Sequence, residues 1–136
     1  MFDVIKIQQG AALRASLERF YRDVFENPDT LPDFLAESCV QRVGPTALSY
    51  SEIVKHVRHV RECVQKIEYS VADAIAQGDT IADRHIVTLT LNDGRSAVLE
   101  VLCFIRIANG KIAELYESSQ VLSGDHALSA LATASE

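Results

Sequence analysis

Hydrophobic and polar residues alternate along most of the chain between residues 78 and 122, with the two-residue period of half-buried β-strands. Two turn motifs, Asn92-Asp93-Gly94 and Asn109-Gly110, divide this stretch. Asp-Gly and Asn-Gly are strong hairpin signals, because both central residues of the favoured turn need a positive φ. The pattern therefore predicts three consecutive antiparallel strands. Their predicted ranges are 80–91, 95–107 and 111–121.

If both turns contain two residues, the register of the three strands follows by counting. His85 then lies opposite Leu102, which lies opposite Glu117. Paired residues share a face of the sheet. One face is predicted to carry Asp83, His85, Val87, Leu89, Val98, Glu100, Leu102, Phe104, Leu115, Glu117 and Ser119. This mixture of large apolar residues, one histidine and three carboxylates is typical of a pocket wall.

The opposite face of these strands is predicted to point outward. Its residues include Ile86, Thr88, Val101, Cys103, Ile105, Tyr116 and Ser118. Such a face is too apolar for open solvent and too polar for a core, so the sequence predicts a homodimer that forms through the outer face of the sheet. A catalytic role for Cys103 is not indicated, because this register places it away from the pocket.

Helical periodicity precedes the strands. Apolar residues recur at helical spacing over residues 10–25, and a capping box, Ser49-Tyr50-Ser51-Glu52, opens a second helix that extends to about Val64. The polar side of this second helix, with His56 and His59, is predicted to face solvent. A short helix from Thr30 and strands over 39–43 and 67–77 complete the predicted elements.

Helices first and meandering strands last indicate an α+β domain. Long antiparallel strands twist and curl. We therefore expect a cone-shaped barrel in which the N-terminal helices close a strongly curved antiparallel sheet. A single domain is predicted over residues 1–123, and the Ala- and Ser-rich tail, 124–136, is predicted to be a weak helix or disordered.

Composition restricts the class of partner. The chain of 136 residues is 48% hydrophobic and 24% charged, as expected for one globular domain, and its net charge of −6 argues against nucleic acid or an anionic membrane as partner. It has no apolar run of the roughly 18 residues that a membrane span needs, and no signal peptide is visible. Three widely spaced cysteines favour free thiols, so we expect a cytoplasmic protein.

Three sequence features identify the chain as similar to the nuclear transport factor 2-like superfamily, in its SnoaL-like, polyketide cyclase-like branch. They are the element order, the segment Gly78-Asp79-Thr80-Ile81-Ala82 before the long hairpin, and Arg106 followed by Asn109-Gly110-Lys111-Ile112-Ala113-Glu114. The resemblance covers residues 11–123 and implies the cone fold. Polyketide cyclases, ketosteroid isomerases, dehydratases and epoxide hydrolases share this fold, so it does not specify one reaction.

The resemblance also implies roles for individual residues. Glu117, in Tyr116-Glu117, stands where SnoaL-type cyclases have their acidic group on the last strand. Tyr21 precedes Asp29 by eight residues, as the oxyanion-hole tyrosine of steroid isomerases precedes an aspartate. The aspartate base of those isomerases has no counterpart here, since the matching strand contains Gln41-Arg42.

These features predict a protein that binds a small apolar or carbonyl-containing molecule without a cofactor. As an enzyme, it would use Glu117 as base toward a C–H bond next to a carbonyl, with His85 and Tyr21 as orienting or donating groups. The residues predicted to bind the ligand are Asp83, Glu100, Leu102, Phe104, Leu115 and Ser119. Three alternatives stay open: a non-catalytic ligand-binding or assembly module, polar groups that only bond one another, and a metal site.

Overall fold

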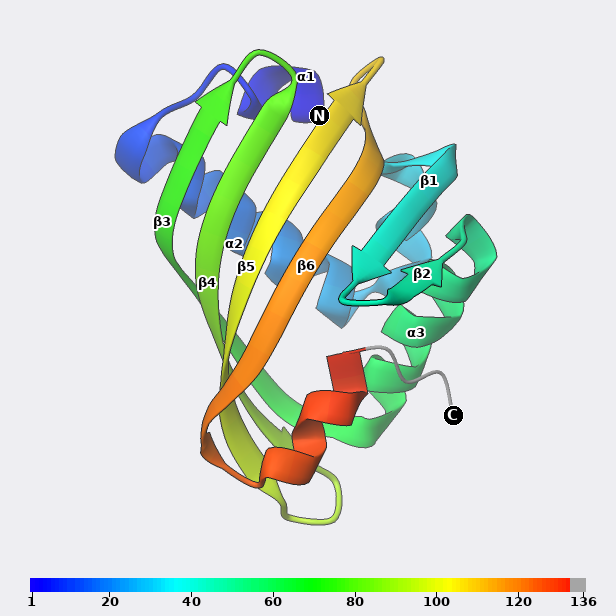
Figure 1. Ribbon diagram of the computed structural model, residues 1–136, viewed down its shortest axis with the longest axis vertical. Helices are drawn as coiled ribbons and strands as arrows, with labels where there is room; N and C mark the ends of the chain where they lie inside the picture. Colours follow the sequence, from blue (N-terminus) through cyan, green and yellow to red (C-terminus); the bar gives the residue numbers. More distant parts are fainter. Residues whose placement is uncertain (133–136) are drawn as a thin grey trace.

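The computed structural model describes residues 1–132 and confirms the predicted α+β fold with a strongly curved sheet (Figure 1). Its elements, in chain order, are α1 (Phe2–Ile5), α2 (Gly10–Glu26), the 3-10 helix η1 (Pro28–Asp33), β1 (Leu35–Val43), β2 (Thr46–Leu48), α3 (Tyr50–Cys63), β3 (Val64–Gln77), β4 (Thr80–Leu91), β5 (Ser96–Ala108), β6 (Lys111–Gly124) and the 3-10 helix η2 (His126–Ala132). Neither α1 nor β2 is predicted by the sequence pattern.

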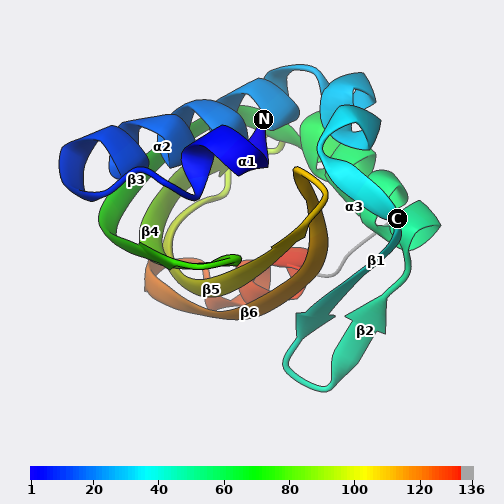
Figure 2. The same cartoon turned by 90° about the horizontal axis from the view of Figure 1, so that it is seen from above.

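The six strands form one sheet in the order β2-β1-β6-β5-β4-β3. All neighbouring strands are antiparallel except β1 and β6, which run parallel. Figure 2 shows the sheet curling, with α1, α2 and α3 on its open side. The sheet does not close on itself, so the helices complete the cone. The main core lies between α2 and the concave face.

The two long helices, α2 and α3, form where the sequence predicted them, for the predicted reasons. In α2 the residues at helical spacing, Leu13, Leu17, Phe20 and Val24, are buried. The capping box of α3 is present, because the Ser49 hydroxyl accepts a hydrogen bond from the Glu52 backbone N–H and the Glu52 carboxylate accepts one from the Ser49 N–H. None of the helices among the described residues is both long and apolar enough to cross a membrane.

The predicted register between β4 and β5 is wrong by one residue. His85 lies opposite Val101 rather than Leu102. The cause is the connecting loop, which contains three residues, because the Leu91 N–H donates to the Arg95 carbonyl (2.7 Å) and the Gly94 N–H donates to the Leu91 carbonyl (3.0 Å). Gly94 adopts a φ of 90°, as the last residue of such a loop requires.

The turn between β5 and β6 is the predicted two-residue turn. Ala108 pairs with Lys111, and Asn109 and Gly110 have φ values of 53° and 75°. A bulge then places two residues of β6, Ile112 and Glu114, opposite consecutive residues of β5, so that Ala113 is the extra residue. This bulge shifts the β5–β6 register by one residue from the prediction.

The two one-residue shifts cancel across β5. The concave face therefore has the predicted residues of β4 and β6, but β5 is turned over. Glu100, Leu102 and Phe104, predicted to face the cavity, lie on the outer face, and the side chains of Leu102 and Phe104 are 48% and 54% exposed. Val101, Cys103 and Ile105, predicted to face outward, are buried.

The 3-10 helix η2 lies at the end of β6 and contacts β5 and β6. Leu128 of η2 is buried in a second hydrophobic cluster that includes Phe25, Leu89 and Leu99. The described part of the predicted tail thus packs against the concave side of the sheet. Residues 133–136 lie outside the described residues, so the prediction for the last part of the tail is not addressed.

Candidate functional site

A cavity of about 200 Å³ lies between the concave face of the sheet and the helices α2 and α3. Its wall consists mainly of aliphatic and aromatic side chains. The residues with polar side-chain atoms along this wall are Tyr21, Gln41, His56, Tyr69, His85, Glu117 and Ser119. An apolar enclosure with a few convergent polar groups is the usual form of a small-molecule site.

Helix α2 places Tyr21 over the middle of the sheet. Glu18, one turn earlier, accepts a hydrogen bond from the Val71 N–H of β3 at 2.8 Å, which holds the helix against this strand. The Tyr21 ring stacks on Tyr69 with a centroid distance of 5.6 Å, and its centroid lies 4.3 Å from that of His85. Burial raises the pKa of the Tyr21 hydroxyl well above its ordinary value, so this group stays protonated.

His85 and Asp83 lie two residues apart on β4 and therefore on the same face. The His85 Nδ1 and Asp83 Oδ1 atoms are 2.7 Å apart. The other carboxylate oxygen of Asp83 accepts a hydrogen bond from the Tyr21 hydroxyl. The Asp83 side chain is 0% exposed and does not line the cavity, whereas His85 does. Asp83 thus lies behind His85, where a ligand in the cavity does not reach it.

The Tyr21 hydroxyl has one hydrogen to donate, and it donates this hydrogen bond to Asp83. Tyr21 was predicted as a donor to an enolate oxygen in the cavity. In the structure its ring forms part of the cavity wall, and its O–H is directed at the buried carboxylate.

Glu117 comes from β6 and lines the cavity together with Leu115 and Ser119 of the same strand. Strand β1, parallel to β6, brings the buried Gln41 beside it, and the Gln41 side chain hydrogen-bonds to the carboxylate. Desolvation raises the pKa of the Glu117 carboxyl above its ordinary value; His85 and Gln41 oppose this shift, and the charge of Asp83 adds to it.

The raised pKa of Glu117 predicts how Glu117→Gln changes stability with pH. Below the ordinary value of 4.5 the carboxyl is protonated in both the folded and the unfolded chain, so the variant and the wild type have similar stability. As pH rises through the raised folded value, the wild type loses stability and the variant does not. Urea unfolding of both proteins across this range measures the difference, which we expect to grow with pH in favour of the variant.

Other ionisable groups surround Glu117 and act on the wild type and the variant alike. They are Asp83 and His85 from β4, Tyr21 from α2, Tyr69 from β3 and Cys103 from β5. The difference between the two proteins therefore reports mainly Glu117. A difference that shrinks as pH rises would contradict the raised pKa.

Five of the predicted site residues line the cavity, namely Tyr21, His85, Leu115, Glu117 and Ser119. Asp83 lies on the predicted face but behind His85. Glu100, Leu102 and Phe104 point away from the cavity, because the three-residue loop after Leu91 turns β5 over. The two residues that carry the proposed acid–base chemistry, His85 and Glu117, are brought to one cavity.

Three polar residues of the cavity were missed by the sequence analysis. Gln41 was noted only as the residue that replaces an aspartate, and Tyr69 received no role. His56 was predicted to face solvent, but it is partly buried and lines the cavity. The alternating pattern of β3 could have indicated Tyr69. For Gln41 the necessary signal was the pairing of β1 with β6, which the sequence did not provide.

The three cysteines are free thiols. Burial raises the pKa of Cys39 to about 11, and it also raises that of Cys103, so neither is a thiolate at neutral pH. Among residues 1–132, no group of three or more His, Cys, Asp or Glu side chains is placed to hold a metal ion, and the metal alternative therefore gains no support.

Comparisons with known proteins agree on the fold. The chain is 23% identical over 120 residues to an uncharacterized protein of Schizosaccharomyces pombe, covering 88% of this chain and 92% of that one. AclR from Streptomyces galilaeus, described as a hydroxylase, has a TM-score of 0.70 at 17% identity, covering 93% of this chain and 89% of that one. IdmH from Streptomyces antibioticus, described as a polyketide cyclase, has a TM-score of 0.62 at 18% identity, covering 71% and 84%.

At these identities the two solved structures establish the fold and leave the reaction open, as their different descriptions illustrate. The sequence model of the SnoaL-like domain matches residues 14–115, which include most of α2, the whole of β4, and Tyr21, Asp83 and His85. The chain therefore belongs to the SnoaL-like domain family.

Proposed function

We propose that this protein is a cofactor-independent enzyme that moves a proton on a small carbonyl compound, as in isomerisation, cyclisation or dehydration. Glu117 and His85 are its acid–base pair. One observation carries the proposal: a carboxyl group with a raised pKa and an imidazole line the same apolar cavity. Titratable groups with shifted pKa values in a cavity are a recognised mark of acid–base sites.

The chemistry needs two groups. One accepts the proton from the carbon next to the carbonyl, and the electron pair of that C–H bond moves toward the carbonyl oxygen. The other donates a proton to this oxygen and so prevents a full negative charge. The product is an enol, which can be reprotonated elsewhere, can attack a second carbonyl or can lose a leaving group. The protein regains its starting protonation when both protons have returned.

The size and polarity of the cavity indicate the substrate class. Its volume of about 200 Å³ is below the roughly 300–1,000 Å³ typical of sites for drug-sized ligands. Most of the wall is aliphatic or aromatic. We therefore expect a compact, mainly apolar ketone or 1,3-dicarbonyl compound of about one ring, in place of an extended polycyclic molecule.

Exchange with heavy water tests this function without a known product. The wild-type protein is incubated in D2O with a panel of cyclic ketones and 1,3-dicarbonyl compounds, and deuterium at the α-carbon is followed by mass spectrometry. Catalysed exchange on at least one compound supports the proposal. Absence of exchange on every compound that binds, with binding followed by ligand-detected NMR, contradicts it.

A non-catalytic ligand-binding module is the second candidate. The polar side chains of the site already bond one another, in Tyr21–Asp83–His85 and in Gln41–Glu117, which is what a binding cavity without chemistry would also show. A carboxylate has about four acceptor positions, so one partner leaves Glu117 able to act on a ligand. The D2O experiment separates the candidates, because a binding module binds the compounds and exchanges none.

We also propose a homodimer that forms through the outer face of the sheet. The corrected register changes the residues of this face but not its character. Leu102, Phe104 and Ile75 are 48%, 54% and 66% exposed, and they border a groove that extends from Arg42 of β1 to Asp73 of β3. Exposed apolar side chains that are grouped in this way are typical of protein interfaces.

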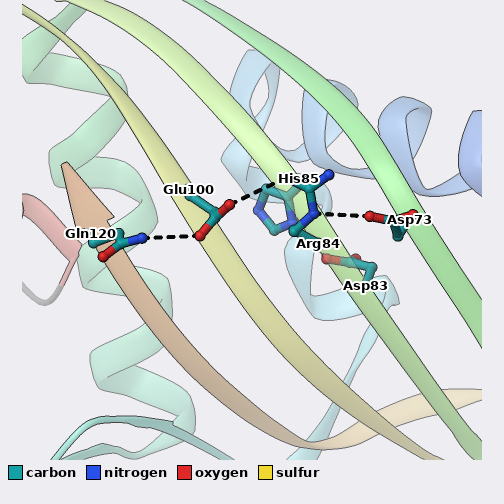
Figure 3. Close-up of polar contacts among 6 residues, drawn as sticks. All are labelled: Asp73, Asp83, Arg84, His85, Glu100 and Gln120. Atoms are coloured by element: carbon teal, nitrogen blue, oxygen red, sulfur yellow. Dashed lines mark hydrogen bonds and ion pairs between the residues drawn. The ribbon is translucent and has the colours of Figure 1, made fainter. Parts of the chain in front are cut away.

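A chain of ionic and polar contacts crosses the same face (Figure 3). Arg84 Nε lies 2.9 Å from the Asp73 carboxylate and its Nη1 lies 3.2 Å from that of Glu100, which also accepts a bond from Gln120 at 3.1 Å. Apolar residues are thus accompanied by polar groups whose charges are already paired. Such a face can cover a second copy of itself without leaving an unpaired charge buried.

Light scattering tests the dimer. We expect twice the chain mass of 15.0 kDa for the wild type and a single chain for Phe104→Asp, because the new carboxylate would be buried against the partner. Ile7→Asp is the matched control, since Ile7 is also apolar and is 77% exposed but follows α1, away from this face. A wild-type particle of one chain at micromolar concentration contradicts the dimer.

We further propose that the protein acts in the cytoplasm. Its three cysteines are unpaired, and free thiols are characteristic of proteins in reducing compartments.

A further inference from the structure

Asp83 lies outside the cavity but contacts its main imidazole. It is one of three buried residues with polar side chains among the described residues, with Gln41 and His85. Burial of a carboxylate is costly unless hydrogen bonds replace its water. Both oxygens of Asp83 have such partners, His85 Nδ1 at 2.7 Å and the Tyr21 hydroxyl. The carboxylate is therefore fixed from two sides, by residues of two different elements.

This contact determines which nitrogen of His85 has the proton. An ionised carboxylate only accepts hydrogen bonds, so Nδ1 must donate and carry the hydrogen. In a neutral imidazole the other nitrogen, Nε2, then has a free electron pair. His85 lines the cavity and its Nδ1 edge is directed at Asp83. The Nε2 edge is consequently the part of the ring available to a ligand.

The orientation of the ring is also restrained by packing. The Tyr21 ring lies against one side of the imidazole, with centroids 4.3 Å apart and an interplanar angle of 32°. Opposite His85 and Arg84, strand β3 has a bulge between Val71 and Asp73, a feature that commonly re-aims side chains next to active sites. Rotation of the ring by 180° would break the bond to Asp83 and leave this buried carboxylate with one partner.

We infer that Asp83 is a positioning residue that sets the direction of proton transfer: it holds His85 in the Nδ1–H form, so that His85 Nε2 is the base and Glu117 is the acid. This assignment rests on the proposed function and reverses the roles that the sequence predicted. Nε2 takes the proton from the substrate carbon, the C–H electron pair moves toward the carbonyl oxygen, and the Glu117 hydroxyl donates its proton to that oxygen.

The charges that result from this step have partners. The imidazolium keeps its bond to the Asp83 carboxylate, and the Glu117 carboxylate keeps its bond to Gln41. The raised pKa of Glu117 agrees with an acid that is protonated before the reaction. With the roles exchanged, a neutral His85 in the Nδ1–H form would have no proton on Nε2 to donate.

NMR of the ¹⁵N-histidine-labelled protein tests the tautomer without any ligand. His85 is identified among the four histidines by the resonance that His85→Gln removes. We expect a protonated Nδ1 and an unprotonated Nε2 in the wild type at neutral pH. Asp83→Asn should shift the ring toward the Nε2–H form, because an amide can donate to Nδ1. Tyr21→Phe, which removes only the second partner of Asp83, should retain the Nδ1–H form.

A wild-type His85 in the Nε2–H form, or protonated on both nitrogens, overturns the inference. This measurement does not depend on Asp83→Asn folding, since the wild type alone decides it. It is also separate from the proposed function: the tautomer can be as expected while no carbonyl compound exchanges deuterium, and exchange can occur while the tautomer is the opposite one.

The pH dependence of exchange tests the direction of transfer. His85 and Glu117 together give a rising and a falling limb whichever of the two is the base. Glu117→Gln leaves His85 as the one reacting group of the pair, so the residual exchange rises with pH if His85 is the base and falls with pH if His85 is the acid. The charged and titratable groups that face Glu117 and His85 are Asp83, Tyr21, Tyr69, Cys103 and, on the cavity wall, His56. If the same pH dependence persists when His56 is also replaced by Gln, it belongs to His85, and a residual rate that falls as pH rises overturns the assignment.

Discussion

Glu117→Gln is expected to slow deuterium exchange on a substrate of this protein by about 10²–10⁴-fold, the usual contribution of a general acid or base. Glutamine keeps the shape of the side chain and can still bond to Gln41, but it can neither take nor transfer a proton. We expect ligand affinity to change little, because the lost proton transfer stabilises the transition state and not the bound ground state. Exchange rate and affinity are measured on the same compound.

Glu100→Gln is the matched control for this result. It makes the same chemical change in a carboxylate that the sequence pattern also predicted to face the pocket, but which the structure places on the outer face beside Arg84. We expect its exchange rate to equal that of the wild type. An unchanged rate in Glu117→Gln would show that Glu117 is not part of the proton transfer. An equal loss in both variants would indicate an indirect effect on folding or assembly.

Leu99→Ala is expected to destabilise the protein by about 2–5 kcal/mol, because Leu99 is 6% exposed and its loss leaves a cavity in the core. Leu102→Ala removes the same side chain three positions later in β5. Leu102 is 48% exposed on the outer face, so we expect a change of about 0.5 kcal/mol in the stability of the single chain. Urea unfolding followed by circular dichroism measures both.

This pair also tests the register of β5. The two-residue turn expected from the sequence would bury Leu102 and expose Leu99, so it predicts the opposite ranking. Unfolding at two protein concentrations distinguishes the contribution of Leu102 to the proposed dimer from its contribution to the single chain. Only the contribution from association depends on protein concentration. A larger concentration-independent loss for Leu102→Ala than for Leu99→Ala would contradict the structure.

The sequence by itself determined the long helices and the long strands and, through them, the fold. The capping box at Ser49, the helical spacing in 10–25 and the alternation after Gly78 are local signals, since neighbouring residues decide them. The same alternation placed His85 and Glu117 on one face. That result was correct because two errors of one residue, in the loop after Leu91 and at Ala113, cancelled between β4 and β6.

Only the tertiary structure decided which way β5 faces. Asn92-Asp93-Gly94 fits both a two-residue and a three-residue loop. In the structure Asp93 Oδ1 accepts the Arg95 N–H at 3.0 Å and Leu91 closes the longer loop. The bulge at Ala113 has no comparable sequence signal. Because side chains alternate along a strand, a register shift of one residue moves every side chain of β5 to the other face of the sheet. Packing against the helices selects between the two registers.

The partners of the proposed acid–base pair also depend on tertiary contacts. Tyr21 reaches Asp83 across 62 positions of sequence, and Gln41 reaches Glu117 through the parallel pairing of β1 with β6. No local pattern contains these approaches, because they arise when α2 packs on the concave face and β1 extends the sheet. The sequence thus placed His85 and Glu117 in the cavity, while long-range packing decided which other groups join them, which are bonded and which remain open to a ligand.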